Sequence, residues 1–392
     1  MSREGCRTFS FRLYPTVGQQ IALTHLFDLQ RELYNAALEA RRGAWAWEKR
    51  STSHFDECKV LTDLRDVRPD VLSFGVIVCR GTLKRLDRAF SAFYRRCAKG
   101  EKPGYPRFRS LSRFDSVQYE DRSGWRLDEE ASRLHLQGIG AVKVRLHRPA
   151  RGIPKAITVR REGRHWLVAI RSVEVPKNPL PSTGKQIGID LGVGVLVGTS
   201  DGKLVKSGRF LKQEEACLKE AQQVVSRRHH GSKGRQRAVQ EVGAIHRKVA
   251  RRRKDLLHKA SRALVDDYDL ICHEALKVSK MTRRPKPRRD EKGGYERNGA
   301  RAKSGLNKSI NDSGWNMLLT MIAYKAEDAG RQMIAVDPRN TSRKCAKCGY
   351  VDKHNRRGVR FSCLSCGHEA HADLNAAVNI LRAGRAQQLR AA

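Results

Sequence analysis

Three acidic residues and four cysteines in the second half of the chain are of types that bind metal ions. The acids are Asp190 in Gly-Ile-Asp-Leu-Gly, Glu274 in Cys-His-Glu-Ala-Leu and Asp373 in Ala-Asp-Leu-Asn, and each lies at the end of an apolar stretch. Converging carboxylates hold divalent ions, and two ions roughly 4 Å apart activate a water and stabilise the leaving oxygen in phosphodiester hydrolysis. The acids therefore predict a site for divalent metal ions.

Each acid also has a purely structural explanation. Asp190 fits a turn or strand end, Glu274 fits a buried acid paired with an arginine, and Asp373 fits a helix N-cap. These explanations leave open why all three acids end apolar elements in a basic protein.

The four cysteines form two pairs, Cys345-Ala-Lys-Cys348 and Cys363-Leu-Ser-Cys366, separated by fourteen residues and each followed by glycine. Two such knuckles present four thiolates to one tetrahedral zinc ion, which would be structural because no position is left for water. A disulfide framework is the competing explanation, but the chain begins without a secretion signal. Small buried hydrophobes are the simplest interpretation of the other six cysteines, which are Cys6, Cys58, Cys79, Cys97, Cys217 and Cys272.

The net charge of the chain indicates what kind of molecule the protein binds. The 392 residues include 79 Lys and Arg against 41 acids, a formal net charge of +38, and the excess runs through the whole chain. Such a surface favours nucleic acid as the partner. No stretch approaches the ~20 apolar residues of a spanning helix, and the first residues have no apolar signal core. The sequence thus predicts a cytoplasmic protein, associated with the nucleoid in a prokaryote, and no membrane partner.

The first half alternates helical and strand patterns. Residues 8–14 predict a strand, Thr16 and Gln19 a capping box ahead of a helix, and residues 71–97 a second long helix with one basic face. Residues 100–109 interleave aromatic and basic side chains, which suits base stacking and phosphate contact as well as it suits a linker. The candidate nucleic-acid contacts are Lys84, Arg85, Arg88, Lys102, Tyr105, Arg107, Phe108 and Arg109.

Strand patterns recur after this loop. Six short runs between residues 117 and 173 predict an antiparallel sheet or barrel, and the Pro-rich residues 176–184 predict a linker into a new domain.

The new domain opens with a strand at residues 187–191. Gly188, Asp190 and Gly192 share one face, which predicts a bare surface with room for a metal ion and a phosphate. The following meander is typical of the opening of a ribonuclease H-like fold. Basic helices are predicted at about 213–228 and 234–266, and a buried strand at 270–276 would place Glu274 beside Asp190 in a parallel α/β arrangement.

Residues 279–306 are polar, basic and glycine-containing. Their composition predicts a disordered insertion, or alternatively a loop that orders on nucleic acid and gates the site.

Together these motifs resemble the TnpB family of transposon-encoded RNA-guided nucleases, which is close to miniature type V CRISPR effectors. The second half carries the resemblance most strongly, through the segments around Asp190, Glu274 and Asp373 and the cysteine pairs just before Asp373. In the first half it rests on Leu-Tyr-Pro at 13–15, Gln-Gln at 19–20, Tyr-Asn at 34–35 and Pro-Gly-Tyr-Pro-Arg-Phe at 103–108. Ala275 replaces the acidic or amide residue that often follows the family's glutamate.

The resemblance implies a multidomain α+β architecture. An N-terminal wedge-like β-barrel (1–15 and 103–180) would be interrupted by a helical recognition lobe (16–102). A ribonuclease H-like (RuvC) α/β nuclease domain (181–340 and 369–392) would carry an inserted zinc ribbon that binds target nucleic acid (341–368). Asp190, Glu274 and Asp373 would bind two catalytic Mg²⁺ ions, while Cys345, Cys348, Cys363 and Cys366 would bind a structural Zn²⁺.

The implied activity is RNA-guided, Mg²⁺-dependent cleavage of double-stranded DNA beside a short adjacent motif, by a monomer or a homodimer on one guide RNA. A miniature type V CRISPR effector is one alternative, separable only by neighbouring DNA. A non-cleaving RNA-guided repressor is another, although such a protein is expected to have lost an acid of the triad. A strand-transfer transposase is a weaker alternative because of where the ribbon lies.

Overall fold

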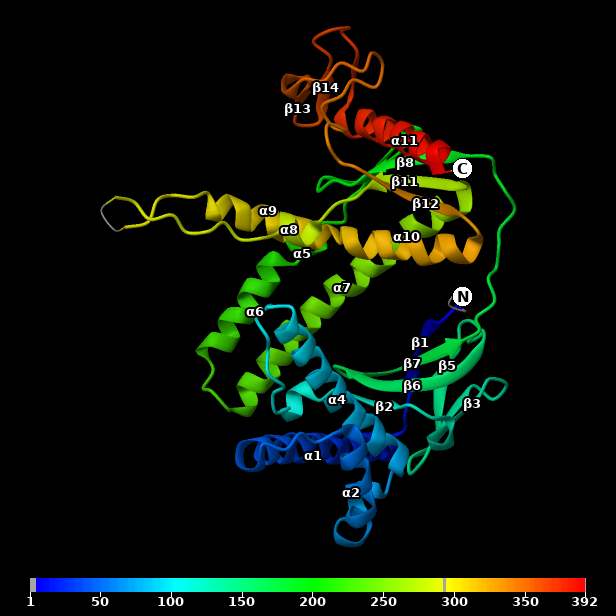
Figure 1. Cartoon of the computed structure of the whole chain (residues 1–392), viewed down its shortest axis with the longest axis vertical. Helices are drawn as coiled ribbons and strands as arrows, with labels where there is room; N and C mark the ends of the chain where they lie inside the picture. The colour runs from blue at the N-terminus through cyan, green and yellow to red at the C-terminus, as the bar shows by residue number, and fades with distance from the viewer. Residues whose placement is uncertain (1–4, 292–293, 392) are drawn as a thin grey trace. The chain divides into compact units, whose positions relative to one another are not determined.

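The computed structural model describes residues 5–291 and 294–391 and divides the chain into two compact units, Met1–Pro176 and Lys177–Ala392. They are called here the N-terminal and C-terminal units, and each is described by itself (Figure 1). Both combine helices with a β-sheet, so the predicted multidomain α+β class is confirmed.

The sheet of the N-terminal unit has seven strands in the order β2-β6-β7-β1-β5-β4-β3, and every neighbouring pair is antiparallel. The order is linear, with β2 and β3 at its edges, so these strands form an open sheet and not the closed barrel that the sequence allowed. Strand bounds are β1 Arg7–Tyr14, β2 Ser116–Tyr119, β3 Trp125–Asp128, β4 Arg133–Leu136, β5 Gly140–Arg145, β6 Ile153–Glu162 and β7 His165–Val173.

Strand β1 lies inside this sheet, between β7 and β5, although about a hundred residues separate it from β2. The intervening helices are therefore an insertion into the sheet's chain order. Phe9, Phe11 and Leu13 of β1 alternate inward and join the core that the helices complete, as a strand with one buried face must. The helices are α1 Val17–Glu48, α2 His54–Val67, α3 Pro69–Leu72 and α4 Val76–Ala98, and short 3₁₀ turns follow at Leu111–Arg113 and Arg122–Gly124.

Helix α1 begins as predicted, because Thr16 and Gln19 form the reciprocal hydrogen bonds of a capping box. The helix predicted from residue 71 is instead broken into α3 and α4. Gly75 causes the break: its φ of +92° lies in the region that favours glycine, and a Cβ there would stand 2.1 Å from the Gln137 side chain.

The sheet of the C-terminal unit has five strands in the order β10-β9-β8-β11-β12. Strands β8, β11 and β12 are parallel, whereas β9 and β10 continue from β8 as the predicted antiparallel meander. Strand bounds are β8 Gln186–Asp190, β9 Val195–Thr199, β10 Leu204–Lys206, β11 Leu270–Glu274 and β12 Gln332–Val336.

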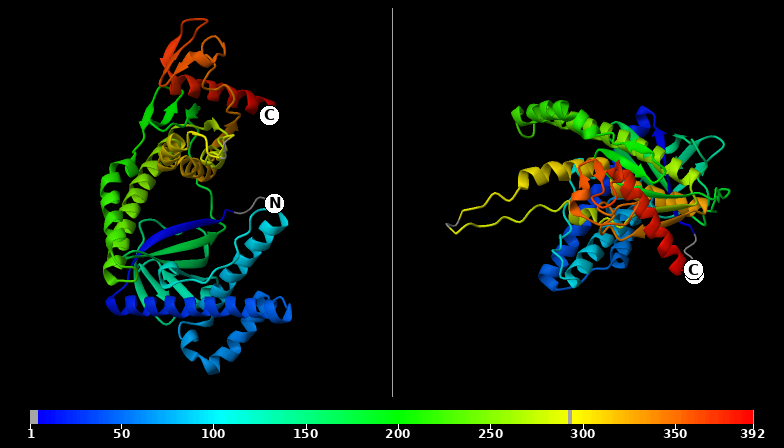
Figure 2. Two further views of the ribbon diagram at one scale, coloured as in Figure 1. Left: turned by 90° about the vertical axis from the view of Figure 1, so that its left-hand side faces the viewer. Right: turned by 90° about the horizontal axis from the view of Figure 1, so that it is seen from above.

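Helices cover both faces of this sheet. Ile187 and Ile189 of β8 pack with Leu257 of α7 and Leu318 of α10, while Cys272 of β11 packs with residues of α11 on the opposite face. The pair α6 and α7 forms a long hairpin (Figure 2, green). Helix bounds are α5 Phe210–Gln213, α6 Glu215–Arg227, α7 Lys233–Asp267, α8 Val278–Met281, α9 Ala300–Ser313, α10 Trp315–Ala329 and α11 Ala372–Ala391.

The segment predicted to be a disordered insertion is partly helical, because α9 begins at Ala300. Side chains of α9 anchor it to the preceding turn: Lys303 donates to the carbonyl of Met281 (2.6 Å) and Asn307 to that of Thr282 (2.8 Å). Residues 292 and 293 of the same segment lie outside the described residues.

A small three-stranded sheet lies between β12 and α11, with strands β13 Arg356–Arg357, β14 Arg360–Ser362 and β15 Glu369–His371 after a 3₁₀ turn at Lys353–Asn355. None of the helices in the described part of the chain combines the length and the apolar character of a membrane-spanning segment.

Candidate active site and metal centre

Asp190 and Glu274 lie at the carboxyl ends of adjacent parallel strands. Strands β8 and β11 pair with Gly188 opposite Cys272 and Ile189 opposite His273, so Asp190 and Glu274 follow at the same level and on the same face. The carboxyl ends of parallel strands are where α/β folds build their sites. The predicted juxtaposition of these two acids is therefore present in the structure.

Asp373 reaches the same place from α11. It lies in the first turn of that helix, and its carboxylate stands 3.7 Å from where a Cβ on Gly192 would be. A Cβ on Gly198, which pairs with Asp190 across β8 and β9, would stand 3.0 Å from the Asp373 Cβ. The structure thus brings all three acids together from two strands and one helix.

The glycine of β8, Gly188, has a different role from the one predicted. A Cβ on Gly188 would lie 2.1 Å from the Ala377 carbonyl oxygen, so this face of the strand is filled by the backbone of α11. The expectation of bare space for a metal ion and a phosphate at Gly188 was wrong. The glycine instead allows the helix that carries Asp373 to approach the strand that carries Asp190.

Burial raises the pKa of two of the acids, and repulsion from the other carboxylates adds to the rise at Asp190. Asp190 is 9% exposed, and burial followed by the charges of Glu274 and Asp373 raises its pKa to about 7. Burial also raises the pKa of Glu274, although a hydrogen bond from the Thr341 hydroxyl and the charge of Arg356 oppose that rise. Buried carboxylates that repel one another are stabilised by a cation, so these residues fit a divalent metal ion.

Arg356 provides a positive charge at the site and was not anticipated from the sequence. Its Nη2 donates to Asp373 Oδ1 at 2.9 Å, and its charge lowers the pKa of both Asp190 and Glu274. Nothing in the sequence distinguishes this arginine from the many others. Its position on β13, within hydrogen-bonding distance of the third acid, is visible only in the fold.

The four predicted cysteines converge at a second site. All four Sγ atoms lie within 4.8 Å of one another, with Cys345 to Cys366 at 3.7 Å and Cys348 to Cys363 at 3.6 Å. Tetrahedral coordination with Zn–S bonds of about 2.3 Å requires sulfurs about 3.8 Å apart, so the cluster fits zinc. Within the described residues it is the one group of three or more metal-binding side chains this close together.

Each knuckle is built by backbone hydrogen bonds around its glycine. The N–H of Gly349 donates to the Cys345 carbonyl, and the N–H of Gly367 donates to the Cys363 carbonyl. Both glycines have a backbone φ above +60°. Burial raises the pKa of Cys363, but hydrogen bonds from the N–H groups of Cys366 and Ser365 and from the neighbouring thiols lower it to about 7, whereas contacts with the other thiols raise the pKa of Cys366. A metal cation stabilises the thiolate form of such a set, since the thiolate is the form that ligates a metal.

Two amides of α11 join the cysteine cluster to the acidic site. Asn375 accepts from the N–H of Ala346 (2.8 Å) and donates to the Lys344 carbonyl (2.8 Å), while Asn379 donates to the carbonyls of Thr341 (3.0 Å) and Lys344 (2.7 Å). Sequence analysis missed both residues, although their spacing of four in Asn-Ala-Ala-Val-Asn places them on one helix face beside Asp373.

The basic residues that the sequence singled out on α4 make internal contacts. Arg85 is half-buried and donates to the Ser116 carbonyl at 2.7 Å, Arg88 pairs with Glu120 at 2.8 Å, and Lys84 lies 3.7 Å from Asp87. Their contact with nucleic acid stays a prediction.

The predicted residues of the following loop are exposed. Phe108 lies under the Arg42 guanidinium at 5.4 Å, Arg109 lies 5.8 Å from the Tyr34 ring, and Tyr105 packs edge-on against Phe90. Lys102 and Arg107 of the same loop are also exposed, and nucleic-acid contact by all five loop residues likewise stays a prediction.

The fold of this chain is shared with a solved structure of a compact protein. A solved complex of Cas12f1 with its guide RNA and target DNA superposes with a TM-score of 0.55, covering 96% of this chain and 98% of that chain at 14% sequence identity. At that identity the likeness shows the shared fold.

Sequence relatives identify the family. InsQ of Escherichia coli strain K12, which is named as an RNA-guided DNA endonuclease, is 35% identical over 306 residues, or 78% of this chain and 73% of InsQ. A Streptomyces pristinaespiralis protein named in the same way is 30% identical and covers 98% of this chain and 91% of its own length. The chain belongs to the TnpB family of RNA-guided DNA endonucleases, and the resemblance seen in its motifs is confirmed.

Three family models match separate segments. Residues 315–380 match a model described as "Cas12f1-like, TNB domain", residues 170–284 match "Probable transposase", and residues 6–50 match "Helix-turn-helix domain". In this structure the last segment is strand β1 followed by the single long helix α1 and not two short helices.

Proposed function

We propose that the protein is an RNA-guided, Mg²⁺-dependent DNA endonuclease that cuts target DNA beside a short adjacent motif with one RuvC-type site. The convergence of Asp190, Glu274 and Asp373 from β8, β11 and α11 carries the proposal, and the names of the family relatives support it. The +38 net charge suits a guide RNA and double-stranded DNA as simultaneous partners.

The three acids would hold two Mg²⁺ ions, which when bound would activate a water and stabilise the leaving oxygen. Asp190 must be ionised for this, so its elevated pKa sets a lower pH limit for binding the ions. Thr341 orients the Glu274 carboxylate through its hydroxyl. Arg356, released from Asp373, would be free to bind a phosphate oxygen, since its guanidinium suits both carboxylates and phosphates.

The domain functions follow from the same proposal. Residues 1–15 and 103–180 would form the wedge, 16–102 the recognition lobe, and 181–340 with 369–392 the nuclease domain. The insert at 341–368 would bind target nucleic acid, with Zn²⁺ on its four cysteines maintaining its two knuckles. Because a closed set of four sulfurs excludes water, that ion would have no part in the chemistry.

A miniature CRISPR effector remains the second candidate. A Cas12f1 of Sulfoacidibacillus thermotolerans is 30% identical over 230 residues, but these span only 49% of that protein. The longer coverage of the TnpB relatives favours the transposon type. The site chemistry would be the same in both.

The test is to purify the protein with its co-expressed RNA, sequence that RNA, and supply matching DNA with Mg²⁺. Asp190→Asn should abolish cleavage and retain RNA and DNA binding. Asp255→Asn is the matched control, because Asp255 is an exposed α7 acid that pairs with the nearby Lys259. A discrete guide RNA without cleavage by the wild type would contradict the nuclease proposal and favour a repressor. If no discrete RNA co-purifies, the proposal that an RNA guides this protein is contradicted.

A further inference from the structure

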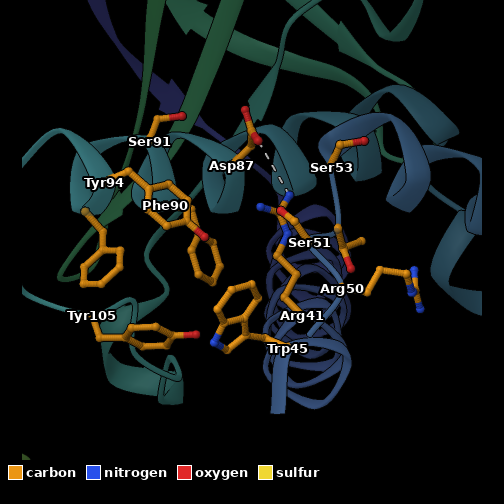
Figure 3. Close-up of a pocket in the computed structure, with 12 residues that line it drawn as sticks. Arg41, Trp45, Arg50, Ser51, Ser53, Asp87, Phe90, Ser91, Tyr94 and Tyr105 are labelled. Carbon is orange, nitrogen blue, oxygen red and sulfur yellow. Dashed lines mark ion pairs between the residues drawn. The ribbon is translucent and has the colours of Figure 1, made fainter. Parts of the chain in front are cut away.

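An aromatic pocket in the N-terminal unit has no part in the site described above. It lies between the last turns of α1, the residues that follow α1, and the second half of α4, and it has a volume of about 560 Å³. That volume lies within the range of about 300–1,000 Å³ that is usual for small-molecule sites. Figure 3 shows Trp45, Phe90, Tyr94 and Tyr105 around the same space, with Arg41 and Asp87 on its other side.

The rings of α4 and of the loop after it form one connected cluster, and Trp45 of α1 lines the same pocket beside them. Phe90 stacks on Tyr94 with centroids 6.1 Å apart, and Tyr105 meets Phe90 edge-on at 5.6 Å and Phe93 at 5.2 Å. These separations are those of attractive aromatic pairs. These four rings therefore hold one another in place before any ligand arrives.

This cluster is too exposed to be a core. Trp45 and Tyr94 are each 58% exposed and Tyr105 is 44% exposed, whereas Phe90 beneath them is 4% exposed. Several large aromatic faces are thus open to solvent in one concave place. Exposed apolar surface that is gathered and rimmed by polar groups marks a binding site.

The opposite wall is polar and rigidly held. Arg41 is 8% exposed, makes two hydrogen bonds to Glu57 (2.6 and 2.8 Å), lies 3.6 Å from Asp87 and covers the Phe90 ring at 5.0 Å. A carboxylate has about four acceptor positions, so Asp87 keeps capacity for a ligand. Serine and threonine residues between α1 and α2 add hydroxyl donors and acceptors.

Stacking faces opposite a hydrogen-bonding wall suit a flat heteroaromatic ring with polar edges. The protein has a net charge of +38 and so attracts the phosphates of nucleic acids. The flat ring that such a partner brings is a nucleobase. We infer that this pocket binds one unstacked nucleobase of a single-stranded nucleic-acid segment, with Trp45 and Tyr94 as stacking platforms. The inference rests on the proposed function for its biological setting, since a guide RNA and a displaced DNA strand are the two sources of such a base.

The experiment measures binding of labelled five-nucleotide oligomers to the full-length protein without guide or Mg²⁺. Oligo(rA), oligo(dA) and an abasic DNA oligomer with the same phosphates are compared. Stacking on one aromatic side chain corresponds to roughly a tenfold change in affinity. The wild type should therefore bind oligo(dA) about tenfold more tightly than the abasic oligomer, and Trp45→Ala should lose most of that preference.

Trp47→Ala is the matched control. Trp47 lies two residues further along α1, is 89% exposed and does not line the pocket, so its variant should keep the preference. Tyr94→Leu provides a second test if Trp45→Ala melts early. Equal affinities for oligo(dA) and the abasic oligomer, or equal losses in the Trp45 and Trp47 variants, would overturn the inference.

The oligomers also separate the two sources of the base. Tighter binding of oligo(rA) assigns the pocket to the guide, and tighter binding of oligo(dA) assigns it to the displaced strand. Guided cleavage is measured separately on the same preparations. A wild type that fails to cleave yet binds bases through Trp45 would contradict the proposed function and leave this inference standing.

Discussion

Replacing Asp190 by Asn should make the metal-free protein more stable, and increasingly so as the pH rises. The pKa of Asp190 is raised from 3.8 to about 7, mainly by burial and then by the charges of Glu274 and Asp373. Between these values the folded state binds more protons than the unfolded state, so its stability falls as pH increases. The Asn side chain has the same shape and does not ionise.

The magnitude follows from the size of the pKa change. A difference of one in pKa corresponds to about 1.36 kcal/mol, so fully ionised Asp190 destabilises the folded state by about 4 kcal/mol. The advantage of Asp190→Asn should grow from about 1.5 kcal/mol at pH 5 to about 4 kcal/mol at pH 8. For a unit of this size the growth corresponds to about 5–10 °C in melting temperature.

Thermal unfolding from pH 5 to pH 8 in buffer without divalent ions is the measurement. Asp255→Asn again serves as the control and should stay within about 0.5 kcal/mol of wild type at every pH, because exposed acids contribute little. Adding Mg²⁺ at pH 8 should raise the melting temperature of the wild type and barely affect Asp190→Asn. Parallel pH curves for wild type and Asp190→Asn would refute the clustering of buried carboxylates.

Three further outcomes are expected. Arg356→Gln should shift the pH–rate profile of cleavage to higher pH, because the arginine lowers the pKa of Asp190 and of Glu274; an unshifted profile would show that it acts elsewhere. Cys363→Ser should lose zinc, measured as metal per chain by atomic emission, whereas exposed Cys217→Ser should retain it; equal zinc contents would contradict the tetrathiolate site. Gly188→Ala should destabilise the C-terminal unit by about 1–3 kcal/mol in denaturant titrations, since its Cβ meets the α11 backbone. Gly305→Ala, with nothing within 4 Å, should not destabilise, and equal losses would refute the close approach.

Local chemistry made part of this structure predictable. The capping box at Thr16 and the paired cysteines each involve residues close in sequence whose side chains act on their own neighbourhood, and both formed as expected. The pairing of Asp190 with Glu274 was also accessible, because parallel strands align their carboxyl ends.

Contacts between distant segments were not predictable. The position of Arg356 beside Asp373 depends on how β13 folds back towards α11, and no local pattern encodes it. The same limit explains the error at Gly188: the pattern showed that one strand face lacks side chains, but not that a helix much later in the chain, at Ala377, fills it. The break at Gly75 was missed because helical periodicity continues on both sides of it.

Helix α11 has a consequence for engineering the insert between β12 and this helix. Asp373 at its start serves the acidic site, while Asn375 and Asn379 in its next turns hold the backbone of the first cysteine knuckle. A graft that exchanged only the cysteine-bearing segment for a foreign one would leave both amides without their carbonyl partners. The transferable module is therefore the insert together with the first two turns of α11.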